Sequence, residues 1–130
     1  MTTLSSGPVS IPKKPEQIYN FLADFNNFGK LMPQQVVNYT CTENDCQFTI
    51  QGMGTLGLKH GDKRPHSFIS MQPNGKAPFN FSLEISISPA EETSTVELKI
   101  IAELNPFLKI MAEKPLTNFL GLLAQKLKEI

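Results

Sequence analysis

Residues 105–130 read NPFLKIMAEKPLTNFLGLLAQKLKEI, and they carry the longest helical pattern of the chain. Asn105 suits the N-cap position, and Pro106 suits the first helical position, where its missing N–H has no helical partner. In the second half, apolar residues recur at a helical spacing, which predicts one buried stripe: Leu116, Phe119, Leu120, Leu123, Leu127 and Ile130. At about 1.5 Å per residue this helix would be about 37 Å long, so a large surface is needed to cover it.

The first half of this helix has a different pattern. Its apolar side chains spread round most of the circumference, so we expect neighbours on more than one side: Phe107, Leu108, Ile110, Met111 and Ala112. Pro115 removes the hydrogen bond to the Met111 carbonyl and crowds that carbonyl. A kink or a short break is therefore expected between Met111 and Leu116.

At the other end of the chain, the sequence predicts an interrupted strand and a short helix. Residues 2–11 read as the strand, and Gly7-Pro8 is where a bulge would correct its register. Pro15 opens the helix, and residues 28–32 fit one further helical turn before Pro33. The helix has one apolar face, made of Ile18, Phe21, Leu22 and Phe25.

From residue 35 to residue 104 the period of the apolar residues changes to two, which predicts strands. In the first hairpin Cys41 faces Cys46 across the turn at residues 42–45. The segment Gly52-Met53-Gly54 ends this hairpin.

A second hairpin is expected from residue 55 to residue 71, with its turn at residues 61–65. The last two strands are expected at residues 79–87 and 96–104, each with one apolar face. Strands of this kind form an antiparallel sheet with one dry face. The final helix is the element large enough to cover that face, so we expect an α+β fold in a single domain, residues 1–130.

The composition limits the classes of function. A chain of 130 residues can bury about two thirds of its surface without disulfides or metals. Twelve basic and twelve acidic residues cancel, so no net charge attracts nucleic acid or anionic lipid. The first residues lack the features of a signal peptide, and no apolar run approaches the length of a membrane span. We therefore expect a cytoplasmic protein without stable membrane anchoring, whose two cysteines are thiols; the oligomeric state stays open.

This order of elements resembles the START-like (SRPBCC) superfamily, the helix-grip fold of Bet v 1, START domains and polyketide cyclases. The resemblance rests on Val9-Ser-Ile-Pro12, on residues 15–24, on residues 25–33 and on the closing helix, and it covers essentially the whole chain. Small bacterial members are the most similar. The resemblance implies a curved seven-stranded antiparallel sheet that grips the last helix around an apolar cavity. The superfamily has no shared catalytic motif, so function needs separate arguments.

The inward-facing apolar residues give a candidate ligand-binding set. It comprises Phe48, Ile50, Leu58, Phe81, Leu83, Ile100, Ala102, Phe107, Met111 and Phe119. Ala102 is the one small inward residue of the last strand, which leaves space for a ligand or lets the helix approach closely. Ordinary core packing would place the same residues inside the protein. The apolar residues spread round the helix before Pro115 nevertheless favour a cavity. Adaptable methionines at positions 32, 53, 71 and 111 fit such a lining.

His60 and His66 are the candidate general bases. His60 shares the parity of Leu58, which points it inward, although a histidine near a strand end can also have its tip in water. A zinc site made with Cys41 and Cys46 is disfavoured, because zinc ribbons use tighter knuckles. The sequence also lacks a serine nucleophile elbow and a glycine-rich phosphate loop. We assign no catalytic residue, metal or cofactor.

The leading hypothesis is the binding or transport of a small hydrophobic ligand, such as a lipid, an isoprenoid or a polyketide-like molecule. Two alternatives stay open. One is a cyclase, dehydratase or hydrolase that uses the same cavity with His60 as its base. The other is a chaperone-interaction module, since some proteins with this fold bind chaperones; it requires a large exposed apolar patch.

Overall fold

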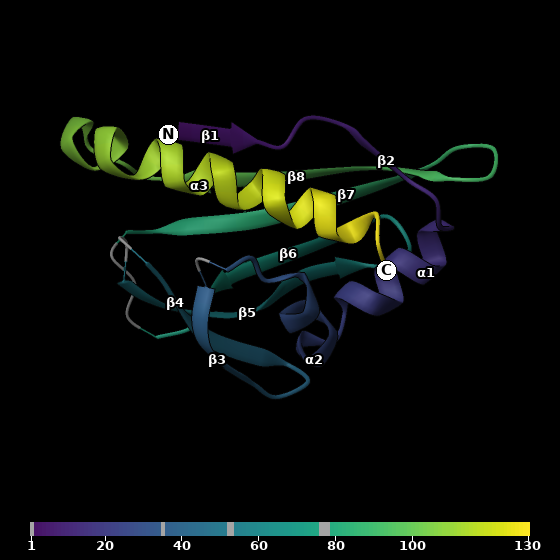
Figure 1. Cartoon of the computed structure of the whole chain (residues 1–130), viewed down its shortest axis with the longest axis horizontal. Helices are drawn as coiled ribbons and strands as arrows, with labels where there is room; N and C mark the ends of the chain where they lie inside the picture. Colours follow the sequence, from purple (N-terminus) through teal and green to yellow (C-terminus); the bar gives the residue numbers. More distant parts are fainter. Residues whose placement is uncertain (1, 35, 52–53, 76–78) are drawn as a thin grey trace.

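The structure, a computed structural model, describes residues 2–34, 36–51, 54–75 and 79–130, and an antiparallel sheet curves around the C-terminal helix (Figure 1). Gln35, Gly52 and Met53 of the predicted strand region lie outside these residues. The strands are β1 (Thr2–Ser5), β2 (Val9–Ile11), β3 (Val36–Cys41), β4 (Asp45–Ile50), β5 (Gly54–Arg64), β6 (Phe68–Pro73), β7 (Phe81–Pro89) and β8 (Ser94–Ala102). The helices are α1 (Pro15–Leu22), α2 (Phe25–Phe28), the 3-10 turn η1 (Gly29–Leu31) and α3 (Pro106–Leu127). The predicted α+β helix-grip fold is confirmed.

The sheet has the strand order β1-β8-β7-β6-β5-β4-β3, and β2 also pairs with β8. Thr2 to Ser5 lie opposite one part of β8, and Val9 to Ile11 lie opposite another. Gly7 joins the two with a backbone φ of 73°, a conformation that glycine adopts without steric cost. β1 and β2 are therefore two pieces of one edge strand, as the predicted interruption at Gly7-Pro8 requires.

Helix α3 begins and packs as its sequence predicts. The Asn105 side chain accepts a hydrogen bond from the Leu108 N–H at 2.8 Å, which caps the helix. One stripe of the helix is buried against the sheet: Ala112, Leu116, Phe119, Leu120, Leu123, Ala124 and Leu127. Burying one such leucine or phenylalanine contributes roughly 1.5–3 kcal/mol. This stripe joins the apolar faces of the strands into one core.

Of the two outcomes expected at Pro115, the short break is wrong, because α3 runs without interruption from Pro106 to Leu127, and the kink stays a prediction. Pro115 still lacks an N–H to offer the Met111 carbonyl. Met111 lies on an exposed turn of the helix, with 55 % of its surface accessible. The loss of this one hydrogen bond does not interrupt the helix.

The expectation that neighbours cover the first half of α3 on several sides is also wrong. Phe107 is 70 % exposed and Ile110 is 82 % exposed. The first turns of α3 project beyond the sheet at the end opposite α1 (Figure 1). Within the part of the chain that the structure describes, these side chains therefore have no apolar cover.

The turn of the second hairpin lies later than predicted. β5 continues to Arg64, and the register between His60 and Lys63 shifts at a bulge. The Asp62 N–H donates to the Ser70 hydroxyl at 2.7 Å, so the backbone N–H of this bulge residue has a hydrogen-bond partner within the sheet. Gly61-Asp62, which read as a turn, thus forms a bulge, and the chain reverses after Arg64 instead. The last two strands lie within two residues of their predicted bounds.

We predict opposite effects for two glycine substitutions. Gly57→Ala should lower the free energy of unfolding by roughly 1–3 kcal/mol, because a Cβ on Gly57 would overlap the Asn74 carbonyl oxygen. The Asn74 N–H donates to the Gly57 carbonyl, which holds the two residues close together. Gly121→Ala should raise it by roughly 0.5–1 kcal/mol, because this exposed position of α3 has free space and alanine favours a helix. Urea unfolding measures both. Equal effects of the two substitutions on stability would contradict the close approach of the Asn74 carbonyl to Gly57 in β5.

Candidate functional site

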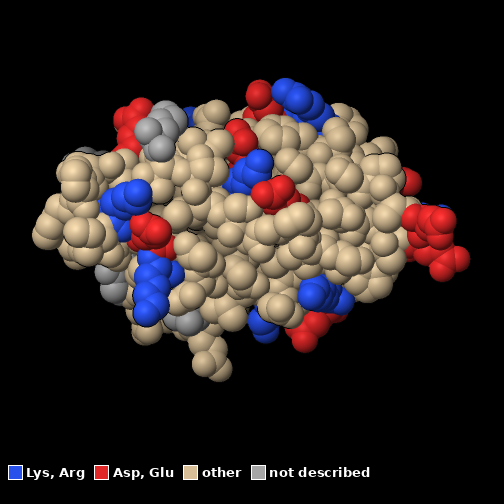
Figure 2. Space-filling model, turned by 90° about the horizontal axis from the view of Figure 1, so that it is seen from above, with Lys and Arg blue, Asp and Glu red and all other residues tan. Residues whose placement is uncertain are grey.

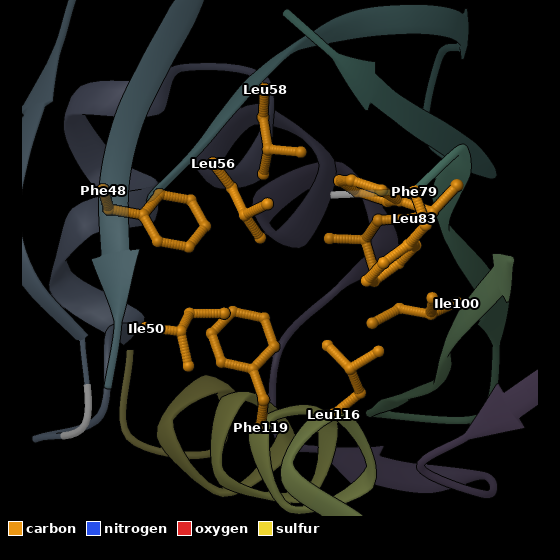
Figure 3. A pocket seen from close by; sticks show the side chains of 10 residues that line it. Phe48, Ile50, Leu56, Leu58, Phe79, Leu83, Ile100, Leu116 and Phe119 are labelled. Atoms are coloured by element: carbon orange, nitrogen blue, oxygen red, sulfur yellow. The ribbon is translucent and has the colours of Figure 1, made fainter. Parts of the chain in front are cut away.

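A small apolar cavity lies between the sheet and α3 (Figure 3). About 20 Å³ of it is open to the centre of a water-sized sphere, which is room for about one water molecule. Every described side chain in its lining is apolar: Phe48, Ile50, Leu56, Leu58, Phe79, Phe81, Leu83, Ile100, Leu116 and Phe119. A water molecule would find no hydrogen-bond partner among these side chains, so the cavity suits an apolar occupant.

The strand and helix periods bring these side chains to one place. Residues two apart on a strand share a face, so Phe48 and Ile50 both point inward from β4. On α3, Leu116 and Phe119 lie one turn apart and point at the sheet (Figure 3). The Phe48 and Phe119 rings stack with centroids 6.2 Å apart and planes 18° apart. This stack is a direct aromatic contact between sheet and helix at the cavity wall.

The structure brings most of the candidate set to this cavity and separates three members from it. Phe48, Ile50, Leu58, Phe81, Leu83, Ile100 and Phe119 line the cavity. Ala102 is fully buried but does not line it, and Phe107 and Met111 are exposed on the projecting end of α3. Ala102 is thus part of the closely packed core.

Three lining residues were absent from the candidate set. Leu56 has the same parity as Leu58, and Leu116 lies one helical turn before Phe119, so both followed from the periodicity. Phe79 precedes β7 in the structure, but it has the same parity as Phe81 and Leu83 in the predicted strand, so the periodicity indicated it as well. Of the methionines, Met71 is buried away from the cavity, while Met53 lies outside the described residues.

A larger groove adjoins the cavity between α3 and the end of β4. It offers about 260 Å³ to the centre of a water-sized sphere. Its lining combines apolar and polar residues: Pro33, Ile50, Gln51, Lys114, Pro115, Asn118, Phe119 and Leu122. Ile50 and Phe119 line both spaces, so the groove and the cavity are adjacent at these two side chains. The groove combines three chain segments, so no local pattern in the sequence indicates it.

His60 lies away from the cavity. Its ring stacks on Phe25 with centroids 4.5 Å apart. Both ring nitrogens are buried without a hydrogen-bond partner among the described residues. Burial lowers the pKa of His60 and nearby Lys63 lowers it further, whereas the Leu22 carbonyl and Asp24 act in the opposite direction. No observation therefore favours His60 as a base acting in the cavity.

Cys41 and Cys46 are free thiols that face each other across the predicted hairpin. The Cys41 thiol donates to the Asn26 side-chain oxygen at 3.3 Å. Burial raises the pKa of Cys46 to about 12, so this thiol is no nucleophile near neutral pH. Among the residues described, no three His, Cys, Asp or Glu side chains gather as metal ligands would.

The surface charges are mixed. On the face seen in Figure 2, Lys and Arg lie beside Asp and Glu in small mixed groups, and uncharged surface lies between the groups. This face therefore presents no basic patch of the kind that nucleic acid requires. In the described ranges, no helix has both the length and the apolar character needed to cross a membrane.

The half-buried His60, whose ring nitrogens are shielded from water, predicts a pH dependence of stability. An unfolded histidine has a pKa of about 6.5, and the pKa of folded His60 is lower, so the unfolded state binds more protons as the pH falls through this range. The melting temperature should therefore fall from about pH 7.5 to about pH 5.5, where most carboxylates stay ionised. His60→Phe keeps a ring on Phe25 and should flatten this dependence. The same slope in both proteins would show that His60 does not cause it.

The fold of this chain is similar to that of 126 solved chains, whereas no protein-family model and no curated protein sequence matches it. A START superfamily protein from Mycobacterium smegmatis has a TM-score of 0.76 and 15% identity over 98% of this chain and 94% of its own. The KanY protein has a TM-score of 0.79 and 16% identity over 99% and 97%. The Aha1 dimer from Colwellia psychrerythraea has a TM-score of 0.68 and 18% identity over 97% and 94%. These identities are low, so the similarity concerns the fold, and the chain has the START-like fold.

Proposed function

We propose that this protein binds or transports a small hydrophobic ligand, such as a lipid, an isoprenoid or a polyketide-like molecule, between the curved sheet and α3. The observation that carries the proposal is the wholly apolar cavity between these two layers. Protein interiors normally pack at the density of organic crystals, so this space marks a place where the core between sheet and helix is packed less closely. The likeness to a START superfamily protein supports a ligand-binding fold in general. The cytoplasm is the proposed location.

The cavity has to enlarge when the ligand enters. Pockets for molecules of drug size measure about 300–1,000 Å³, far more than the space between sheet and helix. Displacement of the Phe119 side chain would join the cavity to the 260 Å³ groove. The ligand would then replace the contacts that Phe119 makes with the sheet. Burial of its apolar surface, worth about 25 cal/mol per Å², would supply the affinity.

Two substitutions on one face of α3 test the cavity. Leu116→Phe adds a ring beside the cavity and should leave the melting temperature unchanged or higher, while it abolishes binding of the neutral fluorescent probe N-phenyl-1-naphthylamine. Leu123→Phe, two turns later, lies in the filled core and should cost roughly 1–3 kcal/mol of stability by overpacking. Thermal unfolding and a fluorescence titration measure the two effects. A stable Leu116→Phe protein that binds the probe like the wild type would contradict the proposed site.

The exposed apolar side chains at the start of α3 favour a second candidate function, a protein-interaction module of the kind that binds chaperones. Phe107, Ile110 and Met111 form this surface, on which an apolar probe could also bind. The double variant Phe107→Ser/Ile110→Ser therefore serves as the control for the titration. If the cavity is the binding site, this variant binds the probe like the wild type. Loss of probe binding would place the site on the exposed end of the helix.

A further inference from the structure

The groove beside the cavity has two chemically different parts. Its floor is apolar and ends at Ile50 and Phe119, the two side chains that it shares with the cavity. Its polar side chains are Lys114, Asn118 and Gln51, and all three residues are exposed. Lys114 and Asn118 are four residues apart on α3, so they lie on the same face of the helix. Gln51 lies across the groove, directly after β4. An apolar floor with a polar mouth fits an amphipathic molecule.

The charge at this mouth is positive. Among the described residues of the groove lining, Lys114 is the only ionisable one, and none of them is a carboxylate. Within the part of the chain that the structure describes, the only ion pair joins Lys99 to Glu97, so no carboxylate there neutralises the Lys114 ammonium. An ammonium and the amide groups of Gln51 and Asn118 are all hydrogen-bond donors. Together they suit a small anionic group such as a carboxylate, whose hydrogen bonds to charged donors are the stronger kind.

The apolar floor of the groove leads from its polar side chains toward the cavity. Phe119 is 6 % exposed and is held by its stack on Phe48, so it closes the cavity against the groove. Rotation of this one side chain would open a continuous path from Lys114 past Ile50 to the apolar lining. A charged group could not follow this path, because the cavity offers it no polar partner.

We propose that the groove is the mouth of the ligand site and that the ligand is an amphipathic molecule with one anionic head. Lys114, with Gln51 and Asn118, holds the head, and the apolar tail passes Ile50 and Phe119 into the cavity. This inference rests on the proposed function, since the tail needs the cavity. The head contact lies in water, so it orients the ligand, and burial of the tail provides most of the affinity.

Displacement of N-phenyl-1-naphthylamine by decanoate and by 1-decanol tests this assignment, with both compounds below the concentrations at which they form micelles. Decanoate should bind the wild type, and Lys114→Met should weaken decanoate binding about two- to five-fold, the range measured for exposed ion pairs, while decanol binding stays unchanged. Lys126→Met is the matched control, because Lys126 is an exposed cation of the same helix outside the groove. It should change neither affinity. Leu116→Phe should abolish binding of both compounds.

The possible results separate the two proposals. If Lys114→Met leaves decanoate binding unchanged, or weakens decanoate and decanol equally, the anionic head is not at Lys114, while ligand binding in the cavity stands. If decanoate binds and Leu116→Phe has no effect on it, the tail does not enter the cavity, and the inference is overturned. If neither compound displaces the probe and the probe itself does not bind, the proposed function is overturned together with the inference.

Discussion

The contact between α3 and the concave face of the sheet is the interaction on which the rest of this structure depends. The sheet has a single apolar face, and α3 is the longest element that covers it (Figure 1). A flat sheet would meet a helix along a line, whereas a curved sheet surrounds it, so most of the core lies between these two layers. The cavity lies where the curvature leaves more room than the side chains fill. Phe48 and Phe119 bridge that space by stacking.

The two ends of α3 are held differently, and this difference determines where a ligand can enter. Near the C-terminal end, α1 and α2 pack on the sheet (Figure 1). The Tyr39 hydroxyl donates to the Phe25 carbonyl at 2.7 Å, the Phe25 N–H donates to the Glu43 carbonyl at 3.1 Å, and the His60 ring stacks on Phe25. At the N-terminal end of α3, the side chains of Phe107, Ile110 and Met111 are exposed. Movement of the helix at that end therefore costs fewer contacts, and the groove at Lys114 lies on that side of Phe119.

Much of this fold could be predicted from the sequence, because its signals are local. The 3.6-residue period of α3, the Asn105 cap and the two-residue period of the strands each depend on near neighbours, and all appear in the structure. The errors have physical causes of two kinds. Gly61-Asp62 suits a turn and a bulge equally well, and only the Ser70 hydroxyl on the adjacent strand decides between them. Phe107 and Ile110 are apolar and yet exposed, because apolar composition does not show where the sheet ends beneath the helix.

The candidate site was less predictable than the fold. Strand parity indicates which side chains point inward, but packing decides which of these enclose a space: Ala102 and Ile100 share a face of β8, and only Ile100 lines the cavity. The groove depends on Gln51, Lys114 and Asn118, which the fold brings together from β4 and α3. Their spacing in the sequence contains no sign of this arrangement.

The central claim is that the sheet and α3 open to enclose an apolar molecule. NMR of the protein with labelled Ile and Leu methyl groups, in the presence of unlabelled 1-decanol, tests it directly. The account predicts intermolecular contacts from the decanol chain to the methyl groups of Leu83, Ile100 and Leu116, which lie deep in the cavity. Contacts confined to Ile110, on the exposed end of the helix, would contradict it.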